Sequence, residues 1–118
     1  MRATRDDVAD AIARLVGANR DVRTQFEENE RLLLDSLRRL ESGEAVESIL
    51  RRLPTREERT ANLDAVRTYY EERHALRKAT IRAALAEGMA IDELATLYAV
   101  PHDVIAGCAA TGLMPTDP

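Results

Sequence analysis

The amino-acid sequence predicts an all-α protein, in which a helical hairpin or bundle is followed by a C-terminal unit of three shorter helices. Two observations favour this fold class. Glycine (5) and proline (4) are scarce among the 118 residues and alanine is abundant, which is typical of helices. Apolar residues recur at helical spacing, and β-branched and aromatic residues never alternate with polar ones as a strand requires. The sequence therefore predicts helices and no sheet.

The first helix is expected to begin at Thr4, whose hydroxyl is suited to cap it. Its apolar residues recur at helical spacing and are Val8, Ile12, Leu15 and Val16. The segment 17–19, Gly-Ala-Asn, is expected to end this helix, because glycine and asparagine readily adopt the backbone conformation of a helix terminus.

The second helix is expected to run from about residue 19 to Gly43. Its apolar stripe, which Leu32 and Leu34 widen, consists of Val22, Phe26, Leu33, Leu37 and Leu40. Asn29 falls on this stripe. Two interpretations stay open for it: a buried asparagine that fixes the register of paired helices, or a polar residue at the edge of the stripe.

A short third helix is expected over residues 46–53, and Pro54 ends it because proline lacks the backbone N–H. Thr55 and Glu58 then match a capping box, in which each side chain binds the backbone N–H of the other. The apolar pattern continues to Gly88. It predicts either one helix of about 30 residues or two stacked helices with a break near Ala79.

So long a helix needs a packing partner, and the second helix is the obvious one. We expect the two to form an antiparallel hairpin bridged by the short helix, with a leftover apolar face that supports a homodimer. Residues 1–78 are assigned to this hairpin and oligomerisation region, and residues 79–112 to the C-terminal unit. Residues 113–118 contain two prolines and are expected to form a disordered tail.

The C-terminal unit resembles the helix-turn-helix proteins over about residues 78–112. Bacterial regulators and recombinases with this motif repeat the phrase Leu-Ala, three residues, Gly-Val-Ser, and here Leu94-Ala95 is followed after three residues by Ala99-Val100-Pro101. Further residues match the core positions of the motif: Ile91, Tyr98, Ile105 and Cys108. The resemblance implies a trihelical core with Ile81, Ala84 and Leu85 on its third side.

The resemblance also implies a DNA-binding regulator whose last helix lies in the major groove. Its outward positions are Pro101, His102, Asp103, Ala106, Gly107, Ala110 and Thr111. Of these, His102 and Thr111 are the candidate donors to bases, and Asp103 is suited to accept from a cytosine amino group. Upstream, four basic residues at i, i+4 spacing are candidate phosphate contacts: Arg73, Arg77, Lys78 and Arg82. A solvated basic face paired with neighbouring acidic residues is the alternative interpretation.

The distribution of charge supports a second function. The net charge of −4 argues against a protein that coats nucleic acid by bulk electrostatics. Residues 55–82 carry seven basic and five acidic residues, a net of +2, whereas residues 83–112 carry four acidic residues and no Lys or Arg. An acidic surface suits a protein partner better than phosphate. The alternative to a DNA-binding homodimer is therefore an interaction module that uses a degenerate helix-turn-helix fold to dock another protein.

Little in the sequence favours catalysis or a cofactor. The single cysteine, Cys108, excludes an intramolecular disulfide and is expected in the core. Glu71 and His74 have the i, i+3 spacing of di-iron bundles, but a partly exposed histidine is the preferred interpretation, and no metal or other cofactor is predicted. No apolar run is long enough for a membrane span. We expect a cytoplasmic protein that is not an enzyme.

Overall fold

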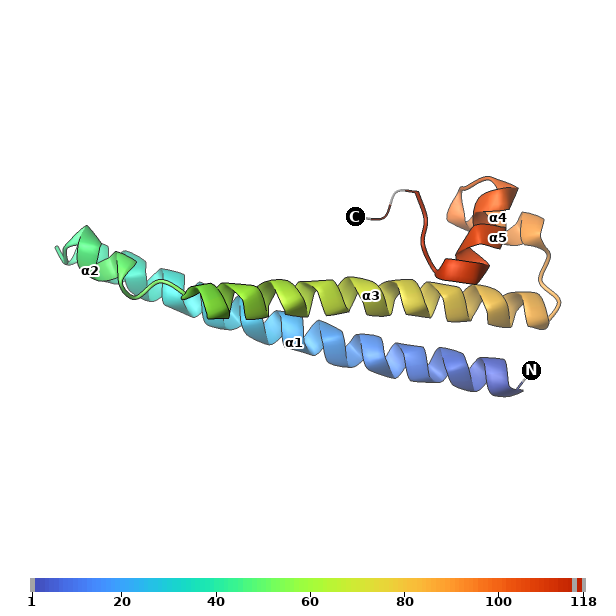
Figure 1. Cartoon of the computed structure of the whole chain (residues 1–118), viewed down its shortest axis with the longest axis horizontal. Helices are drawn as coiled ribbons and strands as arrows, with labels where there is room; N and C mark the ends of the chain where they lie inside the picture. Colours follow the sequence, from blue (N-terminus) through green and yellow to red (C-terminus); the bar gives the residue numbers. More distant parts are fainter. Residues whose placement is uncertain (1, 116, 118) are drawn as a thin grey trace.

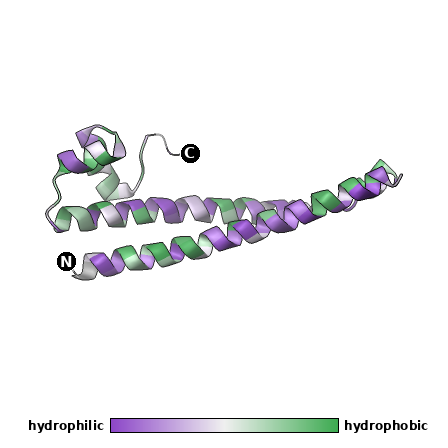
Figure 2. Ribbon diagram, turned by 180° about the vertical axis from the view of Figure 1, so that it is seen from behind, coloured by the Kyte–Doolittle hydropathy of each residue, from purple (hydrophilic) through white to green (hydrophobic). Residues whose placement is uncertain are grey.

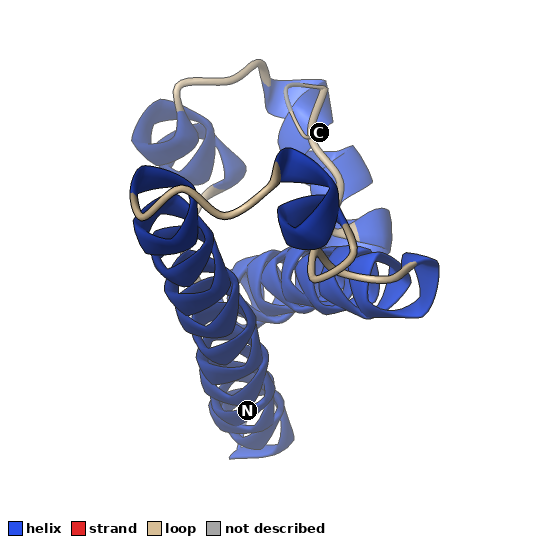
Figure 3. Ribbon diagram, turned by 90° about the vertical axis from the view of Figure 1, so that its left-hand side faces the viewer, coloured by secondary structure: helices blue, strands red, loops and turns tan. Residues whose placement is uncertain are grey.

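The computed structural model describes residues 2–115 and 117, and within them the chain forms helices joined by short loops (Figure 3). The helices are α1 (Arg2–Glu41), α2 (Val46–Leu50), α3 (Arg56–Ala86), α4 (Ile91–Tyr98) and α5 (His102–Thr111). No strand occurs in this part of the chain, so the all-α prediction is confirmed. None of the helices described is long and apolar enough to cross a membrane.

The two long helices, α1 and α3, run antiparallel side by side along a molecule that measures 65 × 28 × 20 Å (Figure 1). The short helix α2 lies at the tip where the chain reverses. At the other end, α4 and α5 pack on the face of α3 that is turned away from α1. The predicted antiparallel hairpin bridged by a short helix is therefore confirmed, and α3 lies between two packing partners over its C-terminal half.

The first helix does not end at residues 17–19, as the sequence predicts, but continues unbroken to Glu41. Gly17 costs a helix interior about 1 kcal/mol relative to alanine. Ala11 and Ala18, two turns apart, are buried to 0% and 5% exposure on either side of it. Because packing on α3 extends across the glycine, tertiary contacts outweigh the local helix-ending signal.

The residues of α1 that face α3 are not those of the strongest apolar stripe. Half-buried or buried positions recur with alternating spacings of three and four residues: Ala11, Leu15, Ala18, Val22, Gln25, Asn29, Leu32, Ser36 and Arg39. Of the stripe predicted between residues 19 and 43, only Val22 and Leu32 belong to this set. Phe26, Leu33 and Leu37 are at least half exposed. Asn29 is half-buried and lines a shallow groove between α1 and α3 together with Asn62 of α3. It therefore lies on the side of α1 that faces α3.

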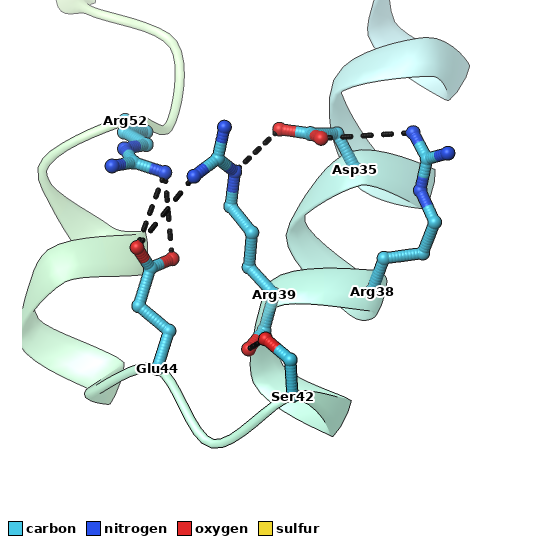
Figure 4. Close-up of polar contacts among 6 residues, drawn as sticks. All are labelled: Asp35, Arg38, Arg39, Ser42, Glu44 and Arg52. Carbon is cyan, nitrogen blue, oxygen red and sulfur yellow. Dashed lines mark hydrogen bonds and ion pairs between the residues drawn. The ribbon is translucent and has the colours of Figure 1, made fainter.

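The tip of the hairpin is held by a chain of ion pairs (Figure 4). The Arg39 guanidinium lies between Asp35, at 2.8 Å, and Glu44, at 3.6 Å, and Arg52 reaches Glu44 at 3.3 Å. The hydrogen bond from Arg39 lowers the pKa of the Asp35 carboxyl. Ser42 donates to the Arg39 carbonyl as α1 ends. The side chains of these ion pairs are between 25% and 42% exposed, and ion pairs this accessible to solvent add little stability, so we attribute to them the direction of the turn.

The start of α3 follows the sequence prediction. The Thr55 hydroxyl accepts a hydrogen bond from the Glu58 backbone N–H at 3.2 Å, and the Glu58 carboxylate accepts one from the Thr55 N–H at 3.3 Å. The capping box is therefore confirmed. No break occurs near Ala79, so the single-helix alternative holds. The buried residues of α3, Ile81 and Ala83, lie just beyond that point, where packing on both sides stabilises a continuous helix.

Candidate nucleic-acid interface

The end of α3 and the helices α4 and α5 share a small core, and we call this part of the chain the C-terminal unit. Ile81, Leu94, Ile105 and Cys108 are each no more than 4% exposed and pack together. Partly buried residues surround them, among them Ala84, Leu85, Met89, Ile91, Ala95 and Val100. The core residues expected from the sequence therefore lie where they were predicted, apart from Tyr98, which is exposed, and Ala99 lies in the turn where it was predicted.

The turn between α4 and α5 depends on Ala99. Its backbone is left-handed, with φ of 54°, and among the residues described no other non-glycine residue has a positive φ. The backbone N–H groups of Ala99 and Val100 donate to the carbonyls of Thr96 and Ala95, which ends α4. Val100 then enters the core, and Pro101 precedes the first residue of α5. This conformation explains why glycine would suit position 99.

The outer face of α5 is open to solvent along its length. All seven positions predicted to face outward, from Pro101 to Thr111, are exposed. His102 and Asp103 occupy the N-terminal end, where the His102 Nδ1 atom lies 3.3 Å from the Asp92 carboxylate of α4. Thr111 lies at the other end, about 14 Å away at 1.5 Å per residue. Its hydroxyl donates to the Gly107 carbonyl and accepts from the Leu113 N–H.

The basic residues of α3 have different environments and do not act as one ridge. Arg73 is exposed, and its guanidinium carbon lies 5.8 Å and 5.9 Å from the ring centres of Tyr69 and Tyr70. Lys78 is half-buried in a shallow groove between α1 and α3, which Arg82 also lines. The Arg82 Nε atom donates to the Ala109 carbonyl at 2.7 Å. Arg82 therefore lies beside the C-terminal end of α5.

Arg77 is directed toward the C-terminal segment. Its Nη1 atom lies 2.6 Å from the Asp117 carboxylate and 3.3 Å from the Gly112 carbonyl, and its side chain is only 16% exposed. The hydrogen bond between the two side chains raises the pKa of Arg77 and lowers the pKa of Asp117. The sequence pattern placed Arg77 with Arg73 because they are four residues apart, whereas the structure gives the two side chains different partners.

Two described residues of the predicted tail, Met114 and Asp117, contact the core of the C-terminal unit and α3, whereas Leu113 and Pro115 are exposed. Met114 packs on the core of the C-terminal unit. The Asp117 carboxylate also accepts a hydrogen bond from the Met114 N–H at 2.6 Å and lies 3.5 Å from the His74 Nε2 atom. Residues 116 and 118 of the predicted tail lie outside the described residues. Sequence reasoning missed Asp117 because its partners, Arg77 and His74, lie about 40 positions away.

The Asp117 contacts predict an acid-sensitive C-terminal segment. A carboxyl whose folded pKa is lowered stabilises the folded form above its unfolded pKa of about 4, and this stability is lost as the pH falls from there toward the folded value. We expect the NMR amide signals of Gly112 and Met114 to titrate below pH 4. Asp117→Asn should abolish this titration, whereas Asp103→Asn, on the exposed face of α5, should leave it unchanged. A midpoint above pH 4 would contradict the assignment.

The electrostatic character of the C-terminal unit differs from one end of α5 to the other. Asp103, in the first turn of α5, and Asp92, in the first turn of α4 and 3.3 Å from the His102 imidazole, are exposed at the N-terminal end of α5, whereas Arg82 and Lys78 lie toward its C-terminal end. The structure therefore brings Arg82 next to α5, at the opposite end from His102 and Asp103.

The remaining reactive side chains are engaged or buried. Burial raises the pKa of the Cys108 thiol, which keeps it protonated and unreactive. Glu72 pairs with Arg14 at 3.1 Å, and His74 faces Asp117. Within residues 2–115 and 117, no three His, Cys, Asp or Glu side chains converge as metal ligands would. The Glu71 and His74 pair therefore has no described companion ligands.

Comparison with known proteins finds no match to a protein-family model, a curated protein or a solved structure. Functional inference for this chain therefore depends on the residues of the C-terminal unit and on the surface of the hairpin.

Proposed function

We propose that this chain is a small transcriptional regulator of the helix-turn-helix type, which binds duplex DNA as a homodimer in the bacterial cytoplasm. The arrangement of α4 and α5 carries the proposal. A turn of three residues through left-handed Ala99 joins the two helices, and both rest on the core around Ile105. The outer face of α5 is exposed along its length. Helix-turn-helix proteins place a short, exposed second helix of this kind in the major groove.

In this proposal the phosphate contacts come from α3. Arg73 is exposed, and its stacking on two tyrosines keeps the guanidinium extended. Arg82 uses its Nε atom to hold α5, and its two terminal nitrogens have no partner among the residues described. Lys78 is beside Arg82 on the same groove. Arg77 holds the C-terminal segment and contributes to DNA binding only by supporting the end of α5.

Base contacts fall to α5. The His102 imidazole is a donor at the N-terminal end, where helix-turn-helix proteins read bases, and Asp103 accepts from a cytosine amino group. Thr111 is the candidate base donor at the far end, where binding would turn its hydroxyl hydrogen from the Gly107 carbonyl to the base. A homodimer would present two such units, and linkage of two weak sites increases the overall affinity.

A fluorescence-polarisation assay with mixed genomic DNA at low salt tests the proposal. The unmodified protein should bind at micromolar concentration or below. Arg73→Ala/Lys78→Ala should bind less tightly at every sequence. The negative slope of log affinity against log salt should become shallower by about 2 per protomer, since each phosphate contact that forms releases about 0.9 counterion and the variant makes two fewer. Asp103→Asn should bind mixed DNA more tightly, because at most sequences no cytosine amino group lies opposite Asp103 and its carboxylate repels phosphate.

The matched control is Arg31→Ala/Arg56→Ala, which removes two exposed arginines from the hairpin away from the C-terminal unit. It should retain both the affinity and the salt slope. Absence of binding by the unmodified protein at micromolar concentration, or an equal loss in the control, would contradict DNA binding through α3.

One observation favours a second function, the docking of a protein partner. The exposed surface of α4 carries Asp92 and Glu93 in its first turn and Leu97, one turn beyond Glu93, which is 72% exposed. An apolar side chain one helical turn from a carboxylate suits a basic partner protein better than phosphate. Under this alternative the unmodified protein does not bind DNA, and Asp103→Asn has no effect in the polarisation assay.

A further inference from the structure

α1 carries two heptad stripes: one faces α3, and the apolar residues of the other are about half exposed. The stripe that faces α3 begins at Ala11 and continues through Leu15 and Ala18. The second stripe lies one residue, or about 100°, further round the helix. It follows positions 12, 16, 19, 23, 26, 30, 33, 37 and 40, the alternation of three and four residues that is typical of a coiled-coil seam. We call it the outer stripe.

The apolar residues of the outer stripe are exposed. Ile12, Val16, Phe26, Leu33, Leu37 and Leu40 each have between 43% and 56% of their surface open to solvent. The stripe covers four heptads and about 42 Å of helix at 1.5 Å per residue. Figure 2 shows apolar segments in the N-terminal part of α1 and again toward the tip, with mainly hydrophilic residues between them. An apolar face of this length is typical of an interaction surface.

The exposed area of the chain is large enough for a stable dimer. Its accessible surface is 8296 Å², whereas a compact protein of 13.1 kDa has about 6,400 Å². The excess of about 1,900 Å² is more than twice the roughly 800 Å² that each partner buries in a standard interface. The radius of gyration is 20.5 Å, whereas a compact chain of this length has about 13.5 Å. Both differences reflect the elongated shape of the molecule.

The polar residues in the middle of the outer stripe decide how a second copy would pair. They are Asn19, Arg23 and Glu30. A parallel pair would place Arg23 opposite Arg23 and Glu30 opposite Glu30, and buried like charges are destabilising. An antiparallel pair with its twofold axis between residues 24 and 25 places Arg23 on the Phe26 ring of the other copy, a favourable cation–π geometry. It also places Asn19 opposite Glu30.

The same antiparallel register matches the apolar layers. Ile12 comes opposite Leu37, and Val16 opposite Leu33. Beside the seam, Arg20 faces Glu27 of the other copy, and residues at these flanking positions set the orientation of coiled coils through salt bridges. A shift of one heptad in either direction would instead place Arg23 against Leu33 or Glu30 against Ile12. The register is therefore selected by complementary charge and by apolar contacts together.

We propose that two copies of this chain associate through the outer stripes of their α1 helices, antiparallel, with the axis between residues 24 and 25. The paired hairpins form a four-helix assembly in which each α1 packs on its own α3 and on the other α1. The proposal names the dimer surface that the proposed function requires, but it holds or fails without reference to DNA.

Light scattering on the full chain tests the association. The unmodified protein should have a mass of about 26 kDa, twice the 13.1 kDa of one chain. Leu33→Glu/Leu37→Glu should reduce it to the mass of one chain while circular dichroism retains the helical signal. The control Leu97→Glu changes an apolar residue of α4 that is 72% exposed and should remain dimeric. A monomer for the unmodified protein, or a dimer for Leu33→Glu/Leu37→Glu, would overturn the proposal.

Charge reversal and a spin label test the orientation. Arg20→Glu and Glu27→Arg should each weaken the dimer about tenfold or more, and the double variant should restore it, because the two residues face each other only in the antiparallel pair. Spin labels on Glu41→Cys should lie about 50 Å apart, twice the distance from the axis at 1.5 Å per residue. Native Cys108 is fully buried and should remain unlabelled. A separation of about 20 Å or less would overturn the antiparallel assignment, as would failure of the double variant to recover.

Discussion

Ile105→Ala is expected to lower the free energy of unfolding of the C-terminal unit by about 3–4 kcal/mol. Ile105 is 0% exposed and packs with Ile81, Leu94 and Cys108. Truncation of a buried isoleucine costs about 2–5 kcal/mol, and the upper part of this range applies where neighbours cannot collapse into the cavity. Here two short helices depend on four fully buried side chains, so the loss is a large fraction of the stability of the unit.

Urea denaturation followed by circular dichroism measures this effect, and hydrogen exchange locates it. Amide protection should fall throughout residues 91–111 and persist near Ala11 and Ala18, where α1 packs on α3. Leu97→Ala is the matched control, because Leu97 is apolar and 72% exposed. It should change stability by no more than about 0.5 kcal/mol. Equal losses for the two variants would contradict the core described for the C-terminal unit.

Gly112→Ala is expected to destabilise the same unit by about 3 kcal/mol or more, for a different reason. Gly112 ends α5 with φ of +79°, a conformation that costs other residues about 1–2 kcal/mol. A methyl group there would also overlap the His74 carbonyl oxygen and would lie 3.2 Å from the Lys78 Cβ atom. Because the obstacle is the backbone of α3, α5 must move away, and overpacking of this kind costs about 1–3 kcal/mol in addition.

Gly88→Ala separates the two contributions. Gly88 has φ of +97° but nothing within 4 Å of the position of an added Cβ atom. This variant should therefore lose only the conformational part, about 1–2 kcal/mol, in the same urea denaturation experiment. The contact of Gly112 with α3 would be disproved if the two variants lost equal stability.

The local signals that were correct are those that depend on neighbouring residues alone. The capping box of Thr55 and Glu58 is formed by groups within a few positions of one another. The same holds for the turn at Ala99, where the sequence motif expects glycine and the structure has a left-handed backbone.

The short helix before the capping box ends at Leu50, three residues before the predicted end at residue 53, so Pro54 is not what ends it. Gly17 was misleading as a helix end. Glycine disfavours a helix interior by about 1 kcal/mol, and the stabilisation from packing Ala11 and Ala18 on α3 is larger than this.

The candidate site was predicted in its composition but not in its geometry. All the residues proposed to face outward on α5 are exposed. The basic residues were grouped by their spacing of four. In the structure, however, Arg77 pairs with Asp117, and Arg82 donates a hydrogen bond to the backbone of α5. Helical spacing gives the relative direction of two side chains on one helix. It carries no information about a partner that approaches from a distant part of the chain.

The sequence by itself determined that the protein is helical, that two long helices form a hairpin and that a small apolar core lies near the C-terminus. Only the tertiary structure decided which of two adjacent stripes on α1 packs against α3. Ala11 and Ala18 have no side chain beyond the Cβ atom to hold the helices apart, so they are buried, although Phe26, Leu33 and Leu37 of the other stripe are larger and more apolar. Close packing selected the hairpin interface, and these three residues are left at least half exposed.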